Sequence, residues 1–282
     1  MKNDSRWQVI LKVMKAPFDV SPDLVPPSVR QRFGIGNKTG QYLDFGGYGY
    51  AVRYGDKVLK VTGDDLEALA SLKIVNKSSK NVAKIFQVKR REYRFRREQA
   101  WDKFSDQTFY IWQKYYEMPT EAMTTAAWIF GDLVIHFQVK SKNTTAKKIA
   151  ATISAFKKVL YDEIGFSSDY EATWDKIERR VKRTSNGEIL RIALTNFQLF
   201  SPVDAAGDKG YADEVMFALK GLMNANKFLR NNGVVYKDYH GGNVRRSGKN
   251  IVVIDLGRST VDDPGQPEVL AGLARRFIER LR

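Results

Sequence analysis

Three side chains in the last fifth of the chain, Asp238, Asn243 and Asp255, have the types and spacing that phosphoryl transfer requires. Asp238 and Asn243 lie five residues apart, and Asp255 follows Asn243 by twelve residues at the end of a Val-Val-Ile run. Phosphoryl transfer needs a carboxylate near the attacking hydroxyl and oxygen ligands for the magnesium ion between the phosphates. Asp238 suits the first role, and Asn243 and Asp255 suit the second. A lone carboxylate ending an apolar strand would otherwise be costly to bury.

The order Asp-x4-Asn followed by Asp-x-Gly resembles the catalytic and metal-binding pattern of the protein-kinase-like superfamily. Tyr236 and Lys237 stand where eukaryotic kinases have His-Arg, and His240 lies inside the loop. This form is similar to that of aminoglycoside and choline phosphotransferases and equally to that of the early Ser/Thr protein kinases of podophages. The resemblance implies ATP and Mg2+ as cofactors and Asp238 as the catalytic residue.

His240 belongs to the catalytic group on the same resemblance, and its role has two interpretations. It could act as a general base or a metal ligand, or it could organise the loop while catalysis rests on Asp238. The chain has only two histidines, and His136 is far away in sequence, which argues against a zinc site. We favour the organising role.

A glycine-rich segment over 44–52 resembles the loop that covers the nucleotide phosphates in this superfamily. The resemblance implies cofactor contacts from four residues of the segment: Gly46, Gly47, Gly49 and Val52. Lys60, in Val-Leu-Lys-Val, resembles the third-strand lysine that pairs with phosphate oxygens. Glu67 is the only Glu of a helix expected over 64–76 and is the candidate partner for Lys60, with a solvent-facing glutamate as the alternative.

An aromatic strand expected over 108–116 leads towards Pro119. By resemblance, the residues that follow this strand form the hinge, where the backbone around Glu117 and Met118 would meet adenine. The residues alone do not indicate this, because an aromatic strand is more often part of the core.

These motifs need strands and helices to position them. We expect strands over 42–45, 50–54, 57–62, 82–88, 108–116 and 250–254, and helices over 6–16, 64–76, 147–161, 170–182, 211–231 and 268–281. Gly55-Asp56 predicts a tight hairpin turn. The order of elements predicts an α+β protein, and the resemblance implies a two-lobed protein-kinase-like fold. Residues 1–118 would form an N-terminal extension and a small β-rich N-lobe, and residues 119–282 a reduced, mostly helical C-lobe.

The composition of the chain indicates its cellular compartment and the kinds of partner that it can bind. The chain has no cysteine, which excludes disulfides and thiolate sites and fits a reducing cytoplasm, that of a host if the gene belongs to a phage. It has no apolar run of 18 residues, so we expect no membrane span and no membrane partner. The formal charge of +15 attracts polyanions. The basic run 89–97, with Tyr93 and Phe95 interleaved, is a candidate nucleic-acid contact, with a solvated charged face as the alternative.

Taken together, the motifs predict a compact Ser/Thr protein kinase of phage or bacterial origin that phosphorylates host proteins. One alternative is a small-molecule phosphotransferase of the aminoglycoside or choline type, whose cationic acceptors fit a +15 chain poorly. Another is an inactive kinase fold that binds nucleic acid or a host protein. Only 25 residues follow Gly257, so a peptide platform is expected elsewhere, in the helical region 120–200. Ser259 and Thr260 are candidate autophosphorylation sites.

Overall fold

The structure, a computed structural model, describes residues 19–20, 25, 27–46, 49–92, 107–140, 145–164, 177, 181, 187–202, 205 and 207–261. The described residues divide into two compact units. Unit 1 holds those up to Ser78, together with Lys84–Tyr115 and Val261, and unit 2 holds Ser79–Ala83 and Tyr116–Thr260. The chain mixes strands and helices, so the predicted α+β class is confirmed.

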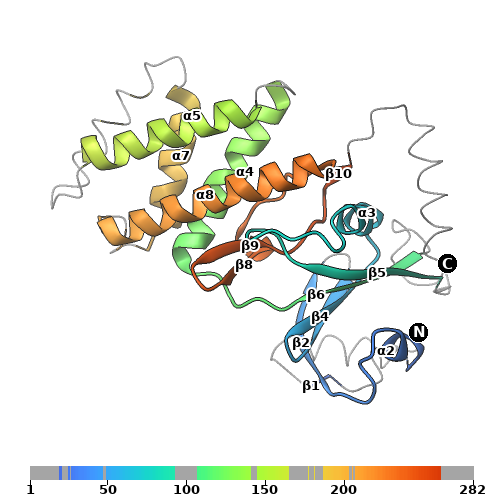
Figure 1. The fold of residues 1–282 in the computed structure, drawn as a ribbon. Helices are drawn as coiled ribbons and strands as arrows, with labels where there is room; N and C mark the ends of the chain where they lie inside the picture. The colour runs from blue at the N-terminus through green and yellow to red at the C-terminus, as the bar shows by residue number, and fades with distance from the viewer. Residues whose placement is uncertain are drawn as a thin grey trace, which may run out of the picture. The chain divides into compact units, whose positions relative to one another are not determined.

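Unit 1 is built on a six-stranded antiparallel sheet (Figure 1). Its strands are β1 (Asp19–Val20), β2 (Gly40–Gly46), β3 (Gly49–Tyr54), β4 (Lys57–Thr62), β5 (Ile85–Glu92) and β6 (Gln107–Lys114), in the spatial order β1-β2-β3-β4-β6-β5. The five strands predicted for this region are confirmed with shifted ends, and β1 is an addition. The predicted turn is also confirmed, since Tyr54 pairs with Lys57 around Gly55, whose φ is +66°.

The two faces of this sheet carry different side chains, because neighbouring residues of a strand point to opposite faces. One face packs against α2 (Pro27–Arg32) in a buried core. That core consists of Val25, Val29, Phe33, Ile35, Tyr42, Val52, Tyr54, Leu59, Val61, Tyr110 and Trp112. Helix α3 (Asp65–Lys73) contacts β5 and β6 and meets the opposite face, which carries Lys60. The Asp64 carboxylate caps α3 by accepting from the N–H groups of Leu66 and Glu67, a contact that stabilises a helix by about 1 kcal/mol.

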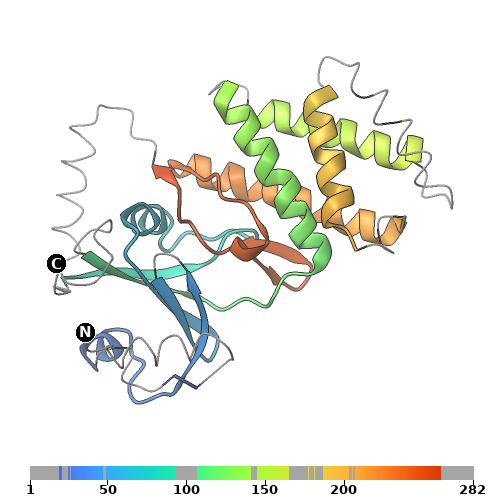
Figure 2. The same cartoon turned by 180° about the vertical axis from the view of Figure 1, so that it is seen from behind.

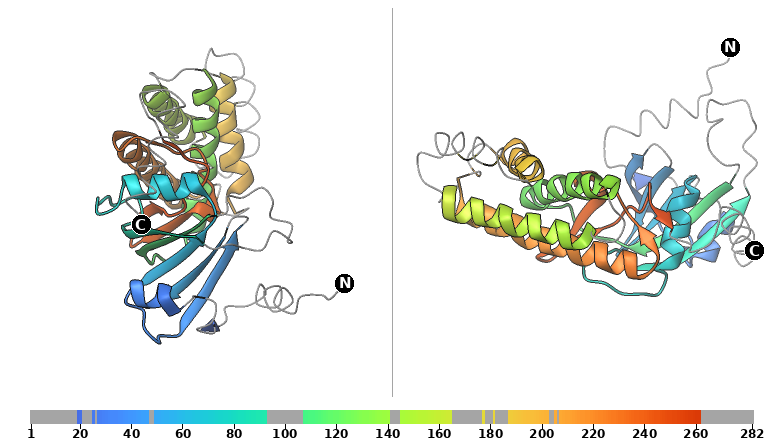
Figure 3. Two further views of the ribbon diagram at one scale, coloured as in Figure 1. Left: turned by 90° about the vertical axis from the view of Figure 1, so that its right-hand side faces the viewer. Right: turned by 90° about the horizontal axis from the view of Figure 1, so that it is seen from above.

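Unit 2 is mainly helical. Its described helices are α4 (Glu121–Lys140), α5 (Thr145–Lys158), the π-helix η2 (Val159–Ile164), α7 (Gly187–Phe200) and α8 (Lys209–Asn231). Helix α4 packs against both α7 and α8, and Figure 2 shows α4 beside α7. Helix α5 contacts α4, α7 and α8, and the view from above in Figure 3 shows α5 along α8. The helix predicted over 211–231 is confirmed as α8, and the one over 147–161 as α5 continued by η2.

Short strands follow α8. Strand β7 (Val234–Val235) pairs with β10 (Thr260–Val261), and β8 (Val244–Ser247) forms a hairpin with β9 (Asn250–Val253). The segment Ser79–Ala83 joins this hairpin, since the Asn81 side chain donates to the Ile251 carbonyl at 2.8 Å. Val82 makes a parallel bridge with Val253 and is not part of the sheet of unit 1, so the predicted start of that strand at residue 82 is wrong.

Several predicted elements lie outside the described residues: the helices over 6–16 and 268–281 and, apart from Ile177 and Val181, the helix over 170–182. Among the helices that the structure does describe, none is both long enough and apolar enough to cross a membrane.

Candidate active site

The loop that carries Asp238 starts where α8 ends. The N–H groups of Asn232 and Gly233 return to carbonyl groups in the last turn of the helix, and Gly233 has a φ of +73°, which suits glycine. Val234 and Val235 then run as a buried strand directly into the loop. The helix stop and the two valines therefore fix the place at which the loop begins.

Tyr236 anchors the main chain at Asp238. Its side chain is fully buried, its hydroxyl donates to the Asp238 carbonyl at 2.6 Å, and its ring packs edge-on against Tyr239 with centroids 4.6 Å apart. Burial, and then the charges of Asp255 and Asp238, raise the pKa of Tyr236 well above its usual value, so the phenol remains a donor. In the sequence, Tyr236 stands out only as a replacement for histidine, and no pattern there indicates this anchoring role.

Asn243 is brought directly to Asp238. Its Nδ2 donates both to the Asp238 carbonyl at 2.9 Å and to the Asp238 carboxylate oxygen Oδ2 at 3.0 Å. Both amide hydrogens are then engaged by one residue, which orients the amide and leaves Oδ1 as its acceptor atom. The side chain is buried, so this orientation is held by packing as well.

His240 organises the same loop. Its Nδ1 accepts from the N–H of Gly242 at 3.1 Å and caps the 3-10 helix η3 (Gly241–Asn243), which assigns the proton of a neutral ring to Nε2. That nitrogen lies 3.6 Å from Oδ2 of Asp238, and Arg258 Nη1 lies 3.8 Å from Oδ1. The His240 imidazole, and to a lesser extent Arg258 and Asn243, lower the pKa of Asp238 against the opposing effect of its partial burial. Asp238 is therefore ionised at neutral pH and can accept a hydrogen bond from a hydroxyl.

Asp255 follows the hairpin that Asn243 helps to close. The N–H of Ile254 donates to the Asn243 carbonyl at 3.0 Å, and the Asp255 Oδ1 accepts from the N–H of Gly257 at 2.8 Å. Asn243 and Asp255 offer oxygen donors, the type that Mg2+ prefers, and Mg2+ commonly uses one or two protein ligands together with substrate phosphates. Among the described residues, no group of three or more His, Cys, Asp or Glu side chains is placed to hold a metal.

Helix α4 supports this loop at two glycines. A Cβ atom on Gly131 would lie 2.2 Å from the Tyr239 carbonyl oxygen, and one on Gly241 would lie 2.6 Å from the Thr124 side chain. Both distances are far below a normal contact, so the helix main chain at Gly131 touches the loop main chain at Tyr239, and the loop main chain at Gly241 touches the Thr124 side chain. The sequence of this region contains no motif that points to the contact. The available signal was a glycine in the middle of a long helix, where it costs about 1 kcal/mol relative to alanine.

Trp128 lies on the same side of α4, between these two contacts. Its ring centroid is 5.6 Å from that of His240 and 5.0 Å from that of Phe200, at the end of α7. The side chain of Trp128 is 37% exposed although it is large and apolar. An aromatic group therefore sits beside the loop with part of its surface open.

In unit 1, the structure brings Lys60 and Glu67 together. Lys60 Nζ lies 2.5 Å from Glu67 Oε1, and the Glu67 side chain is only 4% exposed. The solvent-facing alternative for Glu67 is therefore wrong. A carboxylate buried to this extent is stable only when it is paired, so the position of Glu67 in α3 and the position of Lys60 in β4 depend on each other.

The glycine-rich segment forms the hairpin between β2 and β3. Gly46 pairs with Gly49 at its end, and Gly47 lies outside the described residues. Gly49 has a structural need of its own, because a Cβ there would lie 1.8 Å from the Val61 carbonyl oxygen. The hairpin thus approaches β4 closely, which only glycine allows.

Val52 was predicted to contact the cofactor, and its placement corrects this. Ala51, not Val52, pairs with Lys60, and Val52 is fully buried in the core against α2, on the face opposite Lys60. The structure does not bring Val52 to the side of the sheet where a nucleotide held by Lys60 would lie. Ala51 occupies that side instead.

The predicted hinge residues lie just after strand β6. Strand β6 ends at Lys114, and the main-chain N–H and carbonyl of Glu117 are both hydrogen-bonded to Arg246, at 3.2 and 2.9 Å. The Glu117 carboxylate also pairs with Arg246 at 3.0 Å. The main-chain N–H of Glu117 is therefore already in use, and the contact of the backbone around Glu117 with adenine stays a prediction. The Met118 side chain is 68% exposed and its role stays a prediction.

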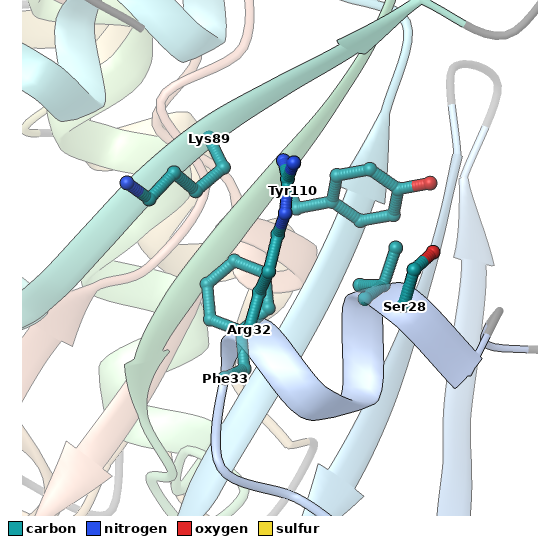
Figure 4. A pocket seen from close by; sticks show the side chains of 6 residues that line it. Ser28, Arg32, Phe33, Lys89 and Tyr110 are labelled. Carbon is teal, nitrogen blue, oxygen red and sulfur yellow. The ribbon is translucent and has the colours of Figure 1, made fainter. Parts of the chain in front are cut away.

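A cavity of about 80 Å³ lies between α2 and the sheet (Figure 4). It is lined by Ser28, Val29, Arg32, Phe33, Lys89 and Tyr110. It is on the face opposite Lys60 and includes none of the described residues predicted to bind nucleotide. The cavity is therefore separate from the predicted nucleotide site. Lys89 begins the predicted basic run, which extends β5 as far as Glu92, while residues 93–97 lie outside the described part of the chain.

With these sites in view, the chain was compared with protein-family models, with curated proteins and with solved structures. None of the three comparisons found a match.

Proposed function

We propose that this chain is an ATP-dependent protein kinase acting on Ser or Thr of host proteins, with unit 1 as a kinase-like N-lobe and unit 2 as its C-lobe. The observation that carries the proposal is the hydrogen bonding of Asn243 to both the carbonyl and the carboxylate of Asp238. Folding alone does not require this pair. Their arrangement holds an ionised carboxylate and an amide oxygen side by side, as phosphoryl transfer needs.

In the proposal, unit 1 binds the phosphates of ATP. The Lys60 ammonium neutralises phosphate oxygens, and Glu67 holds that ammonium in place through the ion pair of 2.5 Å. The β2–β3 hairpin supplies main-chain N–H groups, and Gly49 lets it approach β4 closely.

Unit 2 supplies the acceptor side of the reaction. Asn243 and Asp255 would hold Mg2+, which neutralises charge on the phosphates. Asp238 accepts a hydrogen bond from the acceptor hydroxyl and orients its oxygen towards the γ-phosphorus. As the new oxygen–phosphorus bond forms and the bond to ADP breaks, the hydroxyl proton passes to the Asp238 carboxylate. The lowered pKa of Asp238 makes it a weak base, so orientation is its larger contribution.

The test uses labelled ATP, Mg2+ and a bacterial lysate. We expect label on protein bands with the native chain and none with Asp238→Ala. Glu214→Ala, which removes an exposed carboxylate on α8, serves as the matched control and should label as the native chain does. Label confined to small molecules would replace the proposal with the small-molecule phosphotransferase. Absence of any transfer, with salt-sensitive nucleic-acid binding instead, would overturn the enzymatic assignment.

A second measurement addresses the metal ligands. Mg2+ with ATP should raise the melting temperature of the native chain, and Asp255→Ala should lose that increase. An unchanged increase in Asp255→Ala would contradict the metal assignment.

A further inference from the structure

A continuous row of side chains leads from the catalytic carboxylate to an exposed apolar surface. His240 Nε2 lies 3.6 Å from Asp238, the Trp128 ring centroid lies 5.6 Å from that of His240, and Phe200 stacks on Trp128 at 5.0 Å with an angle of 10° between the rings. Beside Phe200, the Leu199 side chain is 69% exposed. All of these residues belong to unit 2.

Hydrogen bonds between α4, α7 and α8 hold this surface rigidly. Thr125 on α4 donates its hydroxyl to the Phe200 carbonyl at 2.7 Å and accepts from the Tyr211 hydroxyl at 2.7 Å. Two turns further along α4 and one turn earlier in α7, the Asn196 amide donates to the Asp132 carboxylate at 2.7 Å. These contacts lock the end of α7 onto α4, so Trp128 and Phe200 are fixed relative to the catalytic loop before any ligand arrives. Such preorganisation reduces the entropic cost of binding.

The chemistry of the surface indicates its ligand. Phe200 already covers one face of Trp128, so the surface offers ring edges, which suit an apolar side chain better than a flat base that needs an open ring face. The segment from Tyr236 to Arg258, which meets Trp128 through His240, is basic in sequence. Its cations are Lys237, Arg245, Arg246, Lys249 and Arg258, of which Arg246 pairs with Glu117 and Arg258 lies near Asp238, and its two acids, Asp238 and Asp255, are assigned to the reaction.

We propose that Trp128 and Phe200 form a docking platform for the acceptor, a peptide segment with a large apolar side chain close to its Ser or Thr and with acidic residues nearby. The inference rests on the proposed kinase activity and adds its substrate class. His240 Nε2 lies 3.6 Å from Asp238, and the His240 and Trp128 ring centroids are 5.6 Å apart, so the Trp128 ring lies at most about 10 Å from the carboxylate. An extended peptide advances about 3.3 Å per residue. The apolar side chain is therefore expected about two to four residues from the hydroxyl.

The experiment is a peptide library in which each position around a fixed Ser/Thr is varied in turn, incubated with labelled ATP and Mg2+. The native chain should prefer Phe, Leu, Met or Trp at one position and Asp or Glu at others. For the best peptide, Trp128→Ala should raise KM about tenfold, equivalent to about 1.4 kcal/mol, and should abolish the apolar preference. Trp128→Phe should restore most of it.

Phe217→Ala provides the matched control, because Phe217 is a 51% exposed aromatic residue on α8 in the same unit. It should keep the native KM and the native preference. If Trp128→Ala instead lowers kcat for all peptides alike and leaves the preference intact, Trp128 only positions His240 and the platform is refuted. Competition of the peptide by a single-stranded oligonucleotide that depends on Trp128 would refute it in favour of nucleic acid.

Binding of the labelled library without ATP separates this inference from the proposed function. Peptide binding that depends on Trp128, without phosphate transfer to any acceptor, would overturn the kinase activity and support the platform as a peptide site. Phosphate transfer to proteins without any apolar preference would support the kinase activity and overturn the platform.

Discussion

The ion pair between Lys60 and Glu67 can be tested by removing each partner in turn. The Glu67 side chain is 4% exposed and the Lys60 side chain 16% exposed, so a charge that loses this partner is poorly solvated at position 67 and better solvated at position 60. We consider Glu67→Gln, Lys60→Met and the double variant. Lys38→Met, which removes an exposed lysine from unit 1, is the control.

The size of the effect follows from burial and distance. At 2.5 Å and an effective dielectric constant of about 20, the attraction is about 6–7 kcal/mol, most of which is offset by the cost of desolvating two charges. Breaking a buried pair typically costs about 3–5 kcal/mol. Lys60→Met leaves the more buried charge, that of Glu67, without this partner and should lower the free energy of unfolding by about 4 kcal/mol. Glu67→Gln leaves the ammonium of Lys60, which can reach water, and should lower it by about 2–3 kcal/mol. The loss of unfolding free energy in the double variant should be smaller than the sum of the two single losses by at least about 1.5 kcal/mol.

Urea denaturation measures these free energies of unfolding, and hydrogen exchange of the β3, β4 and β6 amides reports on unit 1 directly. Lys38→Met should stay within about 0.5 kcal/mol of the native chain. Additive single effects, or a cost below about 0.5 kcal/mol for Glu67→Gln, would refute the reasoning, because the carboxylate would then be solvated and independent of Lys60. If the pair also serves the proposed reaction, Glu67→Gln should raise the KM for ATP.

Three further predictions concern unit 2. Gly131→Ala should displace the catalytic loop and lower phosphate transfer at least about tenfold, whereas Gly207→Ala, where a Cβ meets nothing within 4 Å, should have no effect; equal activities would contradict the close approach. Asp238 has a lowered pKa, so it contributes stability above the unfolded pKa of about 3.9 that is lost as pH falls through the lower folded pKa. Asp238→Asn should therefore destabilise the chain at pH 7 and much less near pH 2 in urea titrations, and a pH-independent difference would contradict the shift. Mass spectrometry after incubation with ATP should find phosphate on exposed Thr260 and none on fully buried Ser259.

The misplaced Val52 shows a signal that was present in the sequence but not used. Gly55-Asp56 predicts a two-residue turn, and such a turn places Tyr54 opposite Lys57. Counting back along the two strands puts Ala51 opposite Lys60, and Val52 on the other face. The resemblance to a kinase motif suggested the valine, whereas the turn and the period of two determine which face each residue occupies.

Other features could not be derived from the sequence. The two hydrogen bonds between Glu117 and Arg246 join residues more than a hundred positions apart, and they use the main-chain groups assigned to adenine. The contact of Gly131 with Tyr239, in the loop that carries Asp238, also joins residues more than a hundred positions apart. Neither has a periodic or compositional pattern, because each depends on how separate elements pack.

By itself, the sequence determined the residue types available for chemistry, the order of strands and helices, and the local turns, since these depend on short-range propensity and on the alternation of apolar residues. Tertiary structure decided which of those residues meet. It buried Glu67 against Lys60, pointed the Asn243 amide at Asp238, and set Trp128 beside His240. The physical reason is that a buried charge or a buried amide must find a partner wherever packing provides one, and that partner can come from any part of the chain.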